Sequence, residues 1–173
     1  IGISKPIYKP AFSTILAEFV GIVLGDGGIS KRQVTISLHS IDDKEYSQYV
    51  VALIKKLFRV PVSIHPDKNV KVVDLVISRT ELVRFCVDRL GLKIGNKVKQ
   101  QVDIPTWVKK EKKYLSACVR GLVDTDGSVF FHRYKVNGRW YRYKKISFSN
   151  RSEPLIDSVF EALQKFGMNP RIT

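Results

Sequence analysis

Two aspartates, Asp26 and Asp126, occupy the same place in two copies of one sequence pattern. Residues 16–29 read LAEFVGIVLGDGGI and residues 116–129 read SACVRGLVDTDGSV, so each copy ends an apolar run with Asp-Gly. Glycine often stops a helix in the left-handed conformation, and a single Asp-Gly predicts only a helix end with a solvated carboxylate. Its repetition in a strongly basic chain favours a paired site at which two carboxylates act together.

Small residues recur every four positions along both runs and indicate how the carboxylates come together. The stripe consists of Ala17, Gly21 and Gly25 in the first run and Ala117, Gly121 and Thr125 in the second. This spacing lets two helices, expected at residues 13–25 and 113–125, approach closely, as in small-xxx-small helix pairs. The residues expected at the helix interface are Ala17, Gly21, Ala117 and Gly121.

Parallel packing of these helices would place Asp26 and Asp126 side by side at the negative ends of two helix dipoles. Two adjacent carboxylates disfavour joint ionisation, and the helix carbonyl groups add to the unfavourable potential. A cation at this position removes the conflict, and ligation by carboxylate, main-chain carbonyl and water suits Mg²⁺ or a similar hard ion. The spacing therefore predicts a divalent-metal site.

The segments that follow each run predict the supports of this site. Residues 33–39 alternate apolar and polar side chains, and residues 139–149 do likewise with Ile146 and Phe148 expected inward, which is typical of half-buried strands. The strands match at an offset of 110, so that Ser37 corresponds to Ser147. We expect the extra residues of the second copy in a longer turn at residues 135–141.

A helix is expected after each of these strands, at residues 43–58 and from Asn150 to Gly167, with Glu153 completing a capping-box pattern in the second. The first copy continues with strands at residues 60–65 and 70–78 and a third helix that ends at Gly91. The second copy ends at the corresponding point, so we expect either a longer polypeptide or a shortened second half.

The expected fold class is α+β, with two pseudo-symmetric αββαββ-type repeats. The repeats are expected at residues 1–91 and 113–173, and a lysine-rich linker at residues 92–112.

The charge balance indicates a polyanionic partner. The 173-residue chain carries 30 Lys and Arg against 16 Asp and Glu, a formal net charge of +14. Nucleic acid is the first candidate partner and an anionic membrane surface the second. No stretch approaches the roughly 18 apolar residues of a membrane span and no signal segment is present, so we expect an intracellular protein. Cys86 and Cys118 lack CxxC spacing and are expected to be buried thiols.

The two Asp-Gly segments resemble the signature motifs of the LAGLIDADG homing endonucleases in their single-chain form. FVGIVLGDG at residues 19–27 and VRGLVDTDG at residues 119–127 carry the resemblance, and the order of strands and helix after each motif fits as well. The resemblance implies motif helices at a pseudo-twofold interface and a saddle of antiparallel strands in the DNA major groove. It also implies metal-dependent double-strand cleavage at a long recognition site, with a monomer as the working unit.

The last acid of each motif holds the metal ions in that family, which implies Asp26 and Asp126 as catalytic and metal-binding residues. The carbonyl groups of the preceding Gly25 and Thr125 are implied as further ligands. Mg²⁺ is the implied cofactor, with Mn²⁺ or, in a non-cleaving complex, Ca²⁺ as substitutes. Asp124 has no acidic counterpart in the first copy and is interpreted as a structural or capping residue.

A lysine near the reacting water is also implied by the resemblance, in the stretch that follows the third helix of the first repeat. Lys97 is the candidate and Lys99 the alternative. A solvated linker lysine is the competing interpretation.

The outward faces of the expected strands predict a DNA-binding surface. Their polar side chains have the length and the donors and acceptors needed to reach base edges, and the flanking cations can reach phosphates. The residues expected to read bases are Gln33, Thr35, Ser37, His39, Tyr141, Tyr143, Lys145, Ser147 and Ser149. Those expected to contact phosphates are Lys31, Arg32, Lys68, Lys71, Arg133, Arg139, Arg142 and Lys144.

The residues fit two other functions less well. The segment at residues 124–128 resembles the start of haloacid-dehalogenase phosphatases, but too few residues follow it for their α/β domain. A calcium EF-hand lacks its closing glutamate. The alternative that stays open is a non-cleaving relative, either an RNA-splicing maturase that binds its host intron RNA or a DNA-binding regulator. The residues do not distinguish an intron, an intein or a free-standing gene as the origin.

Overall fold

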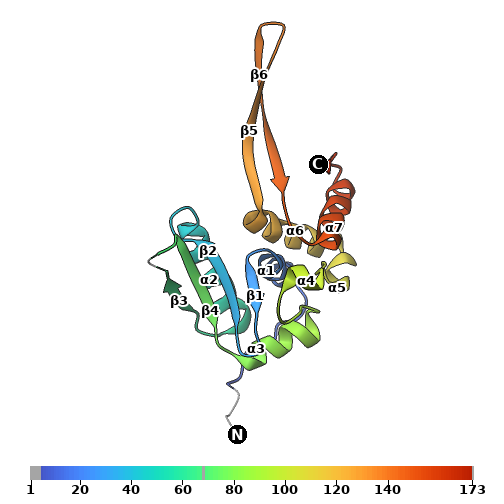
Figure 1. Cartoon of the computed structure of the whole chain (residues 1–173). Helices are drawn as coiled ribbons and strands as arrows, with labels where there is room; N and C mark the ends of the chain where they lie inside the picture. Colours follow the sequence, from blue (N-terminus) through green and yellow to red (C-terminus); the bar gives the residue numbers. More distant parts are fainter. Residues whose placement is uncertain (1–4, 68, 173) are drawn as a thin grey trace.

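The computed structural model describes residues 5–67 and 69–172 as a mixed α+β protein, which confirms the expected fold class. Figure 1 shows a helical centre with a sheet at the left and a long hairpin projecting upward. In chain order the elements are α1 (Thr14–Gly25), β1 (Gly27–Ile29), β2 (Val34–His39), α2 (Lys44–Phe58), β3 (Ser63–Pro66), β4 (Val72–Ile77), α3 (Thr80–Arg84), the π-helical turn η1 (Phe85–Arg89), α4 (Lys97–Gln100), α5 (Thr106–Lys109), α6 (Lys112–Asp126), β5 (Gly127–Val136), β6 (Arg139–Phe148) and α7 (Glu153–Lys165).

The two motif helices, α1 and α6, form the centre of the protein and run parallel, as the spacing predicts. A Cβ atom on Gly121 would lie 2.5 Å from the main-chain oxygen of Glu18, so the two backbones touch without side chains between them. Ala17 and Ala117 are buried on the same two helices. Helix α1 is apolar on all sides because it packs against α6, α2 and β1 at once.

The first half of the chain builds an antiparallel four-stranded sheet in the order β1-β2-β4-β3. Val34, Ile36 and Leu38 of β2 are buried in the core, while the residues between them point to the other face. Helix α2 contributes Val50 and Ile54 to the same core. The alternation that predicts a half-buried strand is therefore confirmed in this half.

The second half differs, because β5 and β6 form a two-stranded hairpin with no further strand beside it in the described part of the chain. Asn137 and Gly138 connect the strands, and both have the positive φ angles, 47° and 78°, that a tight hairpin turn requires. The longer turn expected at residues 135–141 is thus wrong. The extra residues of the second copy lengthen the strands instead.

One face of this hairpin is apolar near its base but exposed. Val129 is 63% exposed and Ile146 61%, whereas Ile29 and Val34, at the matching positions of β1 and β2, are 6% and 0% exposed. The inward position expected for Ile146 is therefore wrong, although Phe148 packs partly against the core. Alternation predicts the side of a strand on which a residue lies, but not whether a second layer covers that side.

Hydrogen bonds correct the alignment of the two halves. The amide of Ser37 donates to the main-chain oxygen of Asp26 at 3.1 Å, and the amide of Ser149 donates to that of Asp126 at 3.3 Å. Ser37 therefore corresponds to Ser149 and not to Ser147. The alignment read from the sequence is therefore wrong by two residues. A shift of two residues keeps every side chain on the same face of the strand, so the apolar pattern does not reveal it.

The glycine after each motif aspartate has a different role from the expected one. Gly127 has φ −98° and ψ 164°, so it is extended and begins β5, and Gly27 begins β1 in the same way. A Cβ on Gly27 would lie 2.5 Å from the Cα of Val23, and one on Gly127 would lie 2.3 Å from the main-chain oxygen of Val123. Glycine is required here because the strand folds back onto the last helical turn.

The segment at residues 92–112 is folded against the body of the protein. Val102, Ile104 and Val108 are buried, and the ring of Trp107 stacks on that of Phe12 at 4.2 Å between centroids. Helix α4 of this segment lies at the C-terminal end of α1, and α5 packs against Phe12 and the start of α6. Cys86 and Cys118 are buried free thiols, as expected. None of the helices within residues 5–67 and 69–172 has the length and apolar character that a membrane crossing requires.

Candidate functional site

Asp26 and Asp126 lie at the coinciding C-terminal ends of α1 and α6 and are both half-buried. A Cβ on Gly25 would lie 3.5 Å from Oδ2 of Asp126, so the carboxylate of α6 reaches across to the last turn of α1. The same Cβ would clash with the Thr125 side chain, whose Oγ1 would be 1.9 Å away. The close helix pair thus brings together the two carboxylates that the sequence singles out.

The surroundings of both carboxylates oppose their ionisation. Burial raises the pKa of Asp26 from 3.8 to about 6, with Asp126 adding to the rise and Lys97 opposing it. Burial also raises the pKa of Asp126, while a hydrogen bond from Asn150 and the charge of Lys97 lower it. A divalent cation between the two groups would relieve this conflict.

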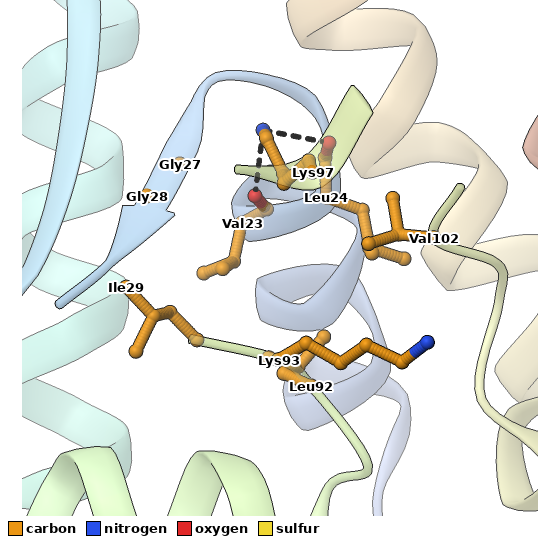
Figure 2. Close-up of a pocket in the computed structure, with 9 residues that line it drawn as sticks. All are labelled: Val23, Leu24, Gly27, Gly28, Ile29, Leu92, Lys93, Lys97 and Val102. Atoms are coloured by element: carbon orange, nitrogen blue, oxygen red, sulfur yellow. Dashed lines mark hydrogen bonds between the residues drawn. The ribbon is translucent and has the colours of Figure 1, made fainter. Parts of the chain in front are cut away.

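Lys97 places its ammonium group at the end of α1, next to this pair. Its Nζ donates to the main-chain oxygens of Val23 at 3.2 Å and Leu24 at 2.8 Å, and also to that of Gly25. Figure 2 shows the first two of these bonds, beside a cavity of about 10 Å³, which has room for about one water molecule. Burial lowers the pKa of Lys97, and the charges of Asp126 and Asp26 oppose this effect.

Lys99, the alternative candidate, lies in the same short helix but has an exposed side chain. Because Lys97 lies on the first position of α4 and α4 is packed over the end of α1, only Lys97 of these two reaches the α1 carbonyl groups.

Asn150 is a site residue that the sequence analysis missed. Its Nδ2 donates to Oδ2 of Asp126 at 2.7 Å, and its Oδ1 accepts from the amide of Ser152 at 2.9 Å. The expected role of Asn150 as a helix cap is wrong, because Ser152 is the residue that precedes α7. The first copy offers no signal for this contact, since its corresponding residue is the buried Leu38.

The donor set fits a hard divalent cation with few protein ligands. The described residues contain no group of three or more His, Cys, Asp or Glu that could enclose a metal. Two carboxylates and the carbonyl groups at the helix ends remain, of which that of Gly25 now accepts from Lys97. Mg²⁺ is usually bound in this way, through one or two carboxylates with water and substrate phosphates as the other ligands.

Asp124 belongs to a polar cluster on the flank of the motif helices. Glu18 is 2% exposed and is paired with Arg120, and it also accepts from the hydroxyl of Tyr49 at 2.6 Å. Burial and the charge of Glu18 raise the pKa of Asp124, which is itself exposed, and Arg120 lowers it. This cluster ties α1, α6 and α2 together and gives Asp124 a structural setting.

The first-half residues expected to bind DNA lie along one face of β2 and in the turns beside it. The side chain of Gln33 donates to Thr35 at 3.3 Å, and Ser37 donates to Asp74 of β4 at 2.6 Å. Lys31 and Arg32 are exposed in the turn between β1 and β2, and Lys71 is exposed just before β4. The Nδ1 of His39 accepts from the amide of Asp42 at 3.1 Å. Lys68 lies outside the described residues.

The second-half residues divide between the two faces of the hairpin. The face that continues the polar surface of β2 carries aromatic rings in contact, with 5.3 Å between the centroids of Tyr134 and Tyr141 and 5.2 Å between those of His132 and Tyr143. The expected residues on this face are Arg139, Tyr141, Tyr143, Lys145 and Ser147, followed by Ser149 after the strand. Those on the opposite face are Arg133, Arg142 and Lys144.

Phe130, His132 and Tyr134 of β5 share the polar, aromatic face and were missed by the sequence analysis. Their signal was available in the sequence, because Asn-Gly at residues 137–138 predicts a two-residue hairpin turn and hence the pairing of both strands.

Comparisons with known proteins agree with the resemblance found in the sequence. The LAGLIDADG-like domain family matches residues 113–173. The replication factor C small subunit of Methanocaldococcus jannaschii is 29% identical over 156 residues, which are 88% of this chain but 7% of that protein. The chain therefore spans only a small part of the length of this relative.

Among solved structures, the homing endonuclease I-DmoI in complex with DNA and Mn is similar with a TM-score of 0.56 and 17% identity, over 92% of this chain and 81% of that one. A structure of mesophilic variants of I-DmoI gives a TM-score of 0.55 and 18% identity, over 89% and 77% of the two chains. The resemblance to the LAGLIDADG homing endonucleases is thereby confirmed at the level of the fold.

Proposed function

We propose that this chain, which has the LAGLIDADG homing-endonuclease fold, is a site-specific endonuclease that hydrolyses both strands of DNA with divalent metal ions. The observation that carries the proposal is the pairing of Asp26 and Asp126 at the ends of two touching parallel helices, with Lys97 beside them. A structural role alone would not require two carboxylates in a place where their ionisation is opposed.

Double-stranded DNA is the proposed substrate because polar strand faces extend from both sides of the carboxylate pair. β1 follows directly from Asp26 and β5 from Asp126, so each strand surface is fixed relative to one carboxylate. The net charge of +14 supports a polyanionic ligand. The neighbours of the same fold include I-DmoI bound to DNA with Mn and with Ca.

The chemistry follows from the donor set. Bound Mg²⁺ or Mn²⁺ would polarise the scissile phosphate, lower the pKa of the attacking water and stabilise the leaving 3′-oxygen. Asp26 and Asp126 would hold the ions, each serving one strand, with the carbonyl groups of Gly25 and Thr125 as further ligands. The ammonium of Lys97 would donate a hydrogen bond to the attacking water and orient it, while the proton of that water passes to the surrounding solvent.

A monomer is the proposed working unit, since one chain supplies both carboxylates and both strand surfaces. The proposal places the protein inside the cell, where its DNA substrate is found. Whether it also binds a host intron RNA is a separate part of the proposal, and RNA binding without any DNA cleavage would favour the maturase alternative.

Selection followed by cleavage tests this function without knowledge of the target. Duplexes that the protein binds would be enriched from a randomised library in Ca²⁺ and then incubated with Mg²⁺. We expect both strands of the selected duplexes to be cut by the wild type and not by Asp26→Asn or Asp126→Asn. Tight, sequence-selective binding with no cleavage in Mg²⁺ or Mn²⁺ would instead identify a DNA-binding regulator.

A further inference from the structure

The main chains of the two half-sites are matched. In each half the carbonyl group of the motif aspartate accepts a hydrogen bond from the strand that returns beside it, at 3.1 Å from Ser37 and 3.3 Å from Ser149. The helix-to-strand turn is therefore held in the same way on both sides. These main-chain hydrogen bonds therefore do not distinguish the two half-sites.

The side chains around the two carboxylates are not matched. Asp126 accepts a hydrogen bond from Asn150 at 2.7 Å. The corresponding residue of the first half is Leu38, which is 2% exposed and has no donor. No side chain within residues 5–67 and 69–172 donates a hydrogen bond to the carboxylate of Asp26 in the same manner.

Asn150 is itself held by the turn that follows β6. Its Oδ1 accepts from the amide of Ser152, and the buried hydroxyl of Ser152 donates to the main-chain oxygen of Val102 at 2.6 Å. Gln101 adds two bonds, to the main-chain oxygen of Arg151 at 3.2 Å and from the amide of Glu153 at 3.0 Å. The amide that orients Asp126 is thus anchored to the segment directly after α4, which carries Lys97.

We propose that Asn150 is a positioning residue that makes the two metal half-sites unequal, so that the Asp126 half binds its divalent cation more tightly and its strand is cut first. The inference rests on the proposed function. The neutral amide group of Asn150 can keep its hydrogen bond to one lone pair of the Asp126 carboxylate while other lone pairs bind the cation. The carboxylate is then already held in place before the cation binds, which lowers the entropic cost of binding.

Calcium titration of the duplex-bound protein, followed by calorimetry, tests this without any cleavage. We expect two unequal binding steps in the wild type. Asp126→Asn should lose the tighter step and Asp26→Asn the weaker one. Asn150→Leu, which copies the residue of the first half, should weaken the tighter step about 10-fold to 100-fold.

Gln101→Gly is the matched control for loss of turn structure. It removes two hydrogen bonds to the same turn, and glycine accepts the φ of 46° found there. This variant should keep both binding steps within about threefold of the wild type, because the amide of Asn150 is untouched. An equal effect of Gln101→Gly and Asn150→Leu would show that only the stability of the turn matters and would overturn the inference.

Strand order gives the second readout. On a duplex labelled on both strands, the wild type should nick one strand before the other in Mg²⁺. Asn150→Leu should nick the two strands at equal rates. Two equal calcium steps in the wild type, or unchanged steps in Asn150→Leu, would overturn the role of Asn150 and leave the endonuclease standing. A wild type that binds no divalent cation would overturn the proposed function as well.

Discussion

Gly21 of α1 lies so close to Cys118 of α6 that a Cβ atom on the glycine would be 2.1 Å from the main-chain oxygen of the cysteine. The same contact recurs one turn later, where a Cβ on Gly25 would meet Thr125. The backbones touch at Gly21, and the backbone of Gly25 touches the side chain of Thr125, so the two helices cannot slide or rotate independently. The separation of Asp26 and Asp126 is therefore set by the glycine contacts and not by the aspartates themselves.

Substitution of Gly21 should damage the fold through this contact. Gly21→Ala forces the two helices apart, and we expect a loss of at least about 1–3 kcal/mol in the free energy of unfolding, the range seen for overpacked cores. Gly28→Ala is the control, since a Cβ there would meet nothing within 4 Å. Urea denaturation should show a lower midpoint for Gly21→Ala alone, and equal midpoints for the two variants would contradict close helix contact.

Lys97 should be required for cleavage but not for DNA binding. Lys97→Met removes the ammonium beside the carboxylate pair, and we expect a loss of about 10²–10⁴ in the cleavage rate, the usual contribution of a positioned proton-transfer group. Lys99→Met, an exposed neighbour on the same helix, should cleave at the wild-type rate. Single-turnover kinetics in Mg²⁺ and affinities in Ca²⁺ separate the two effects, and comparable rate losses in both variants would reject Lys97.

Asp26 should make the metal-free protein less stable as the pH rises. Its pKa in the folded protein, about 6, exceeds the ordinary 3.8, so between these values the folded state holds a proton that the unfolded state has released. Stability is thus lost as pH increases through this window. Asp26→Asn should gain about 1 kcal/mol over the wild type at pH 7, allowing for solvent screening of a half-exposed group, and nothing at pH 4.

Thermal unfolding in a chelating buffer measures this gain across the pH range. Glu161→Gln, an exposed carboxylate on α7, is the matched control and should follow the wild type at each pH. Added Mg²⁺ should stabilise the wild type more than Asp26→Asn, which keeps only the Asp126 half-site. A gain for Asp26→Asn that is the same at pH 4 and pH 7 would contradict the raised pKa.

DNA affinity should fall steeply with salt, and Arg139 should contribute to the slope. The logarithm of the binding constant should decrease linearly with that of the salt concentration, by about 0.9 for each phosphate neutralised. Arg139→Ala on the polar hairpin face should reduce the slope by about that amount. Lys56→Ala on α2, where the lysine is exposed away from the strand surface, should not, and an equal reduction in both would assign the effect to net charge.

The centre of the site could be predicted from the sequence because local spacing determines it. Gly21 and Gly121 each belong to a stripe of small residues spaced by four, and the two stripes permit one close packing of the helices. The aspartates that follow must then meet. Lys97 could be proposed only through the family resemblance, because nothing in residues 92–112 indicates which lysine the fold of that segment turns toward α1.

The contacts that the sequence could not predict depend on tertiary structure. Asn150 matches a capping pattern, but its side-chain amide donates to Asp126, and Ser152 is the residue that precedes the helix. Ile146 has the alternation of a core residue, yet no layer within the described residues covers it. Both errors have one origin, since a pattern in the chain defines a side chain's direction but not its neighbour.

Metal-dependent cleavage of a selected duplex is the most direct test of the paired-carboxylate site. The wild type, Asp26→Asn and Asp126→Asn would be compared at equal occupancy of DNA, with EDTA, Ca²⁺ or Mg²⁺, and both strands would be followed on a denaturing gel. We expect cuts in both strands for the wild type in Mg²⁺ alone, with binding retained in both variants. Double-strand cleavage that survives in both aspartate variants, or is absent from the wild type in every metal, would contradict it.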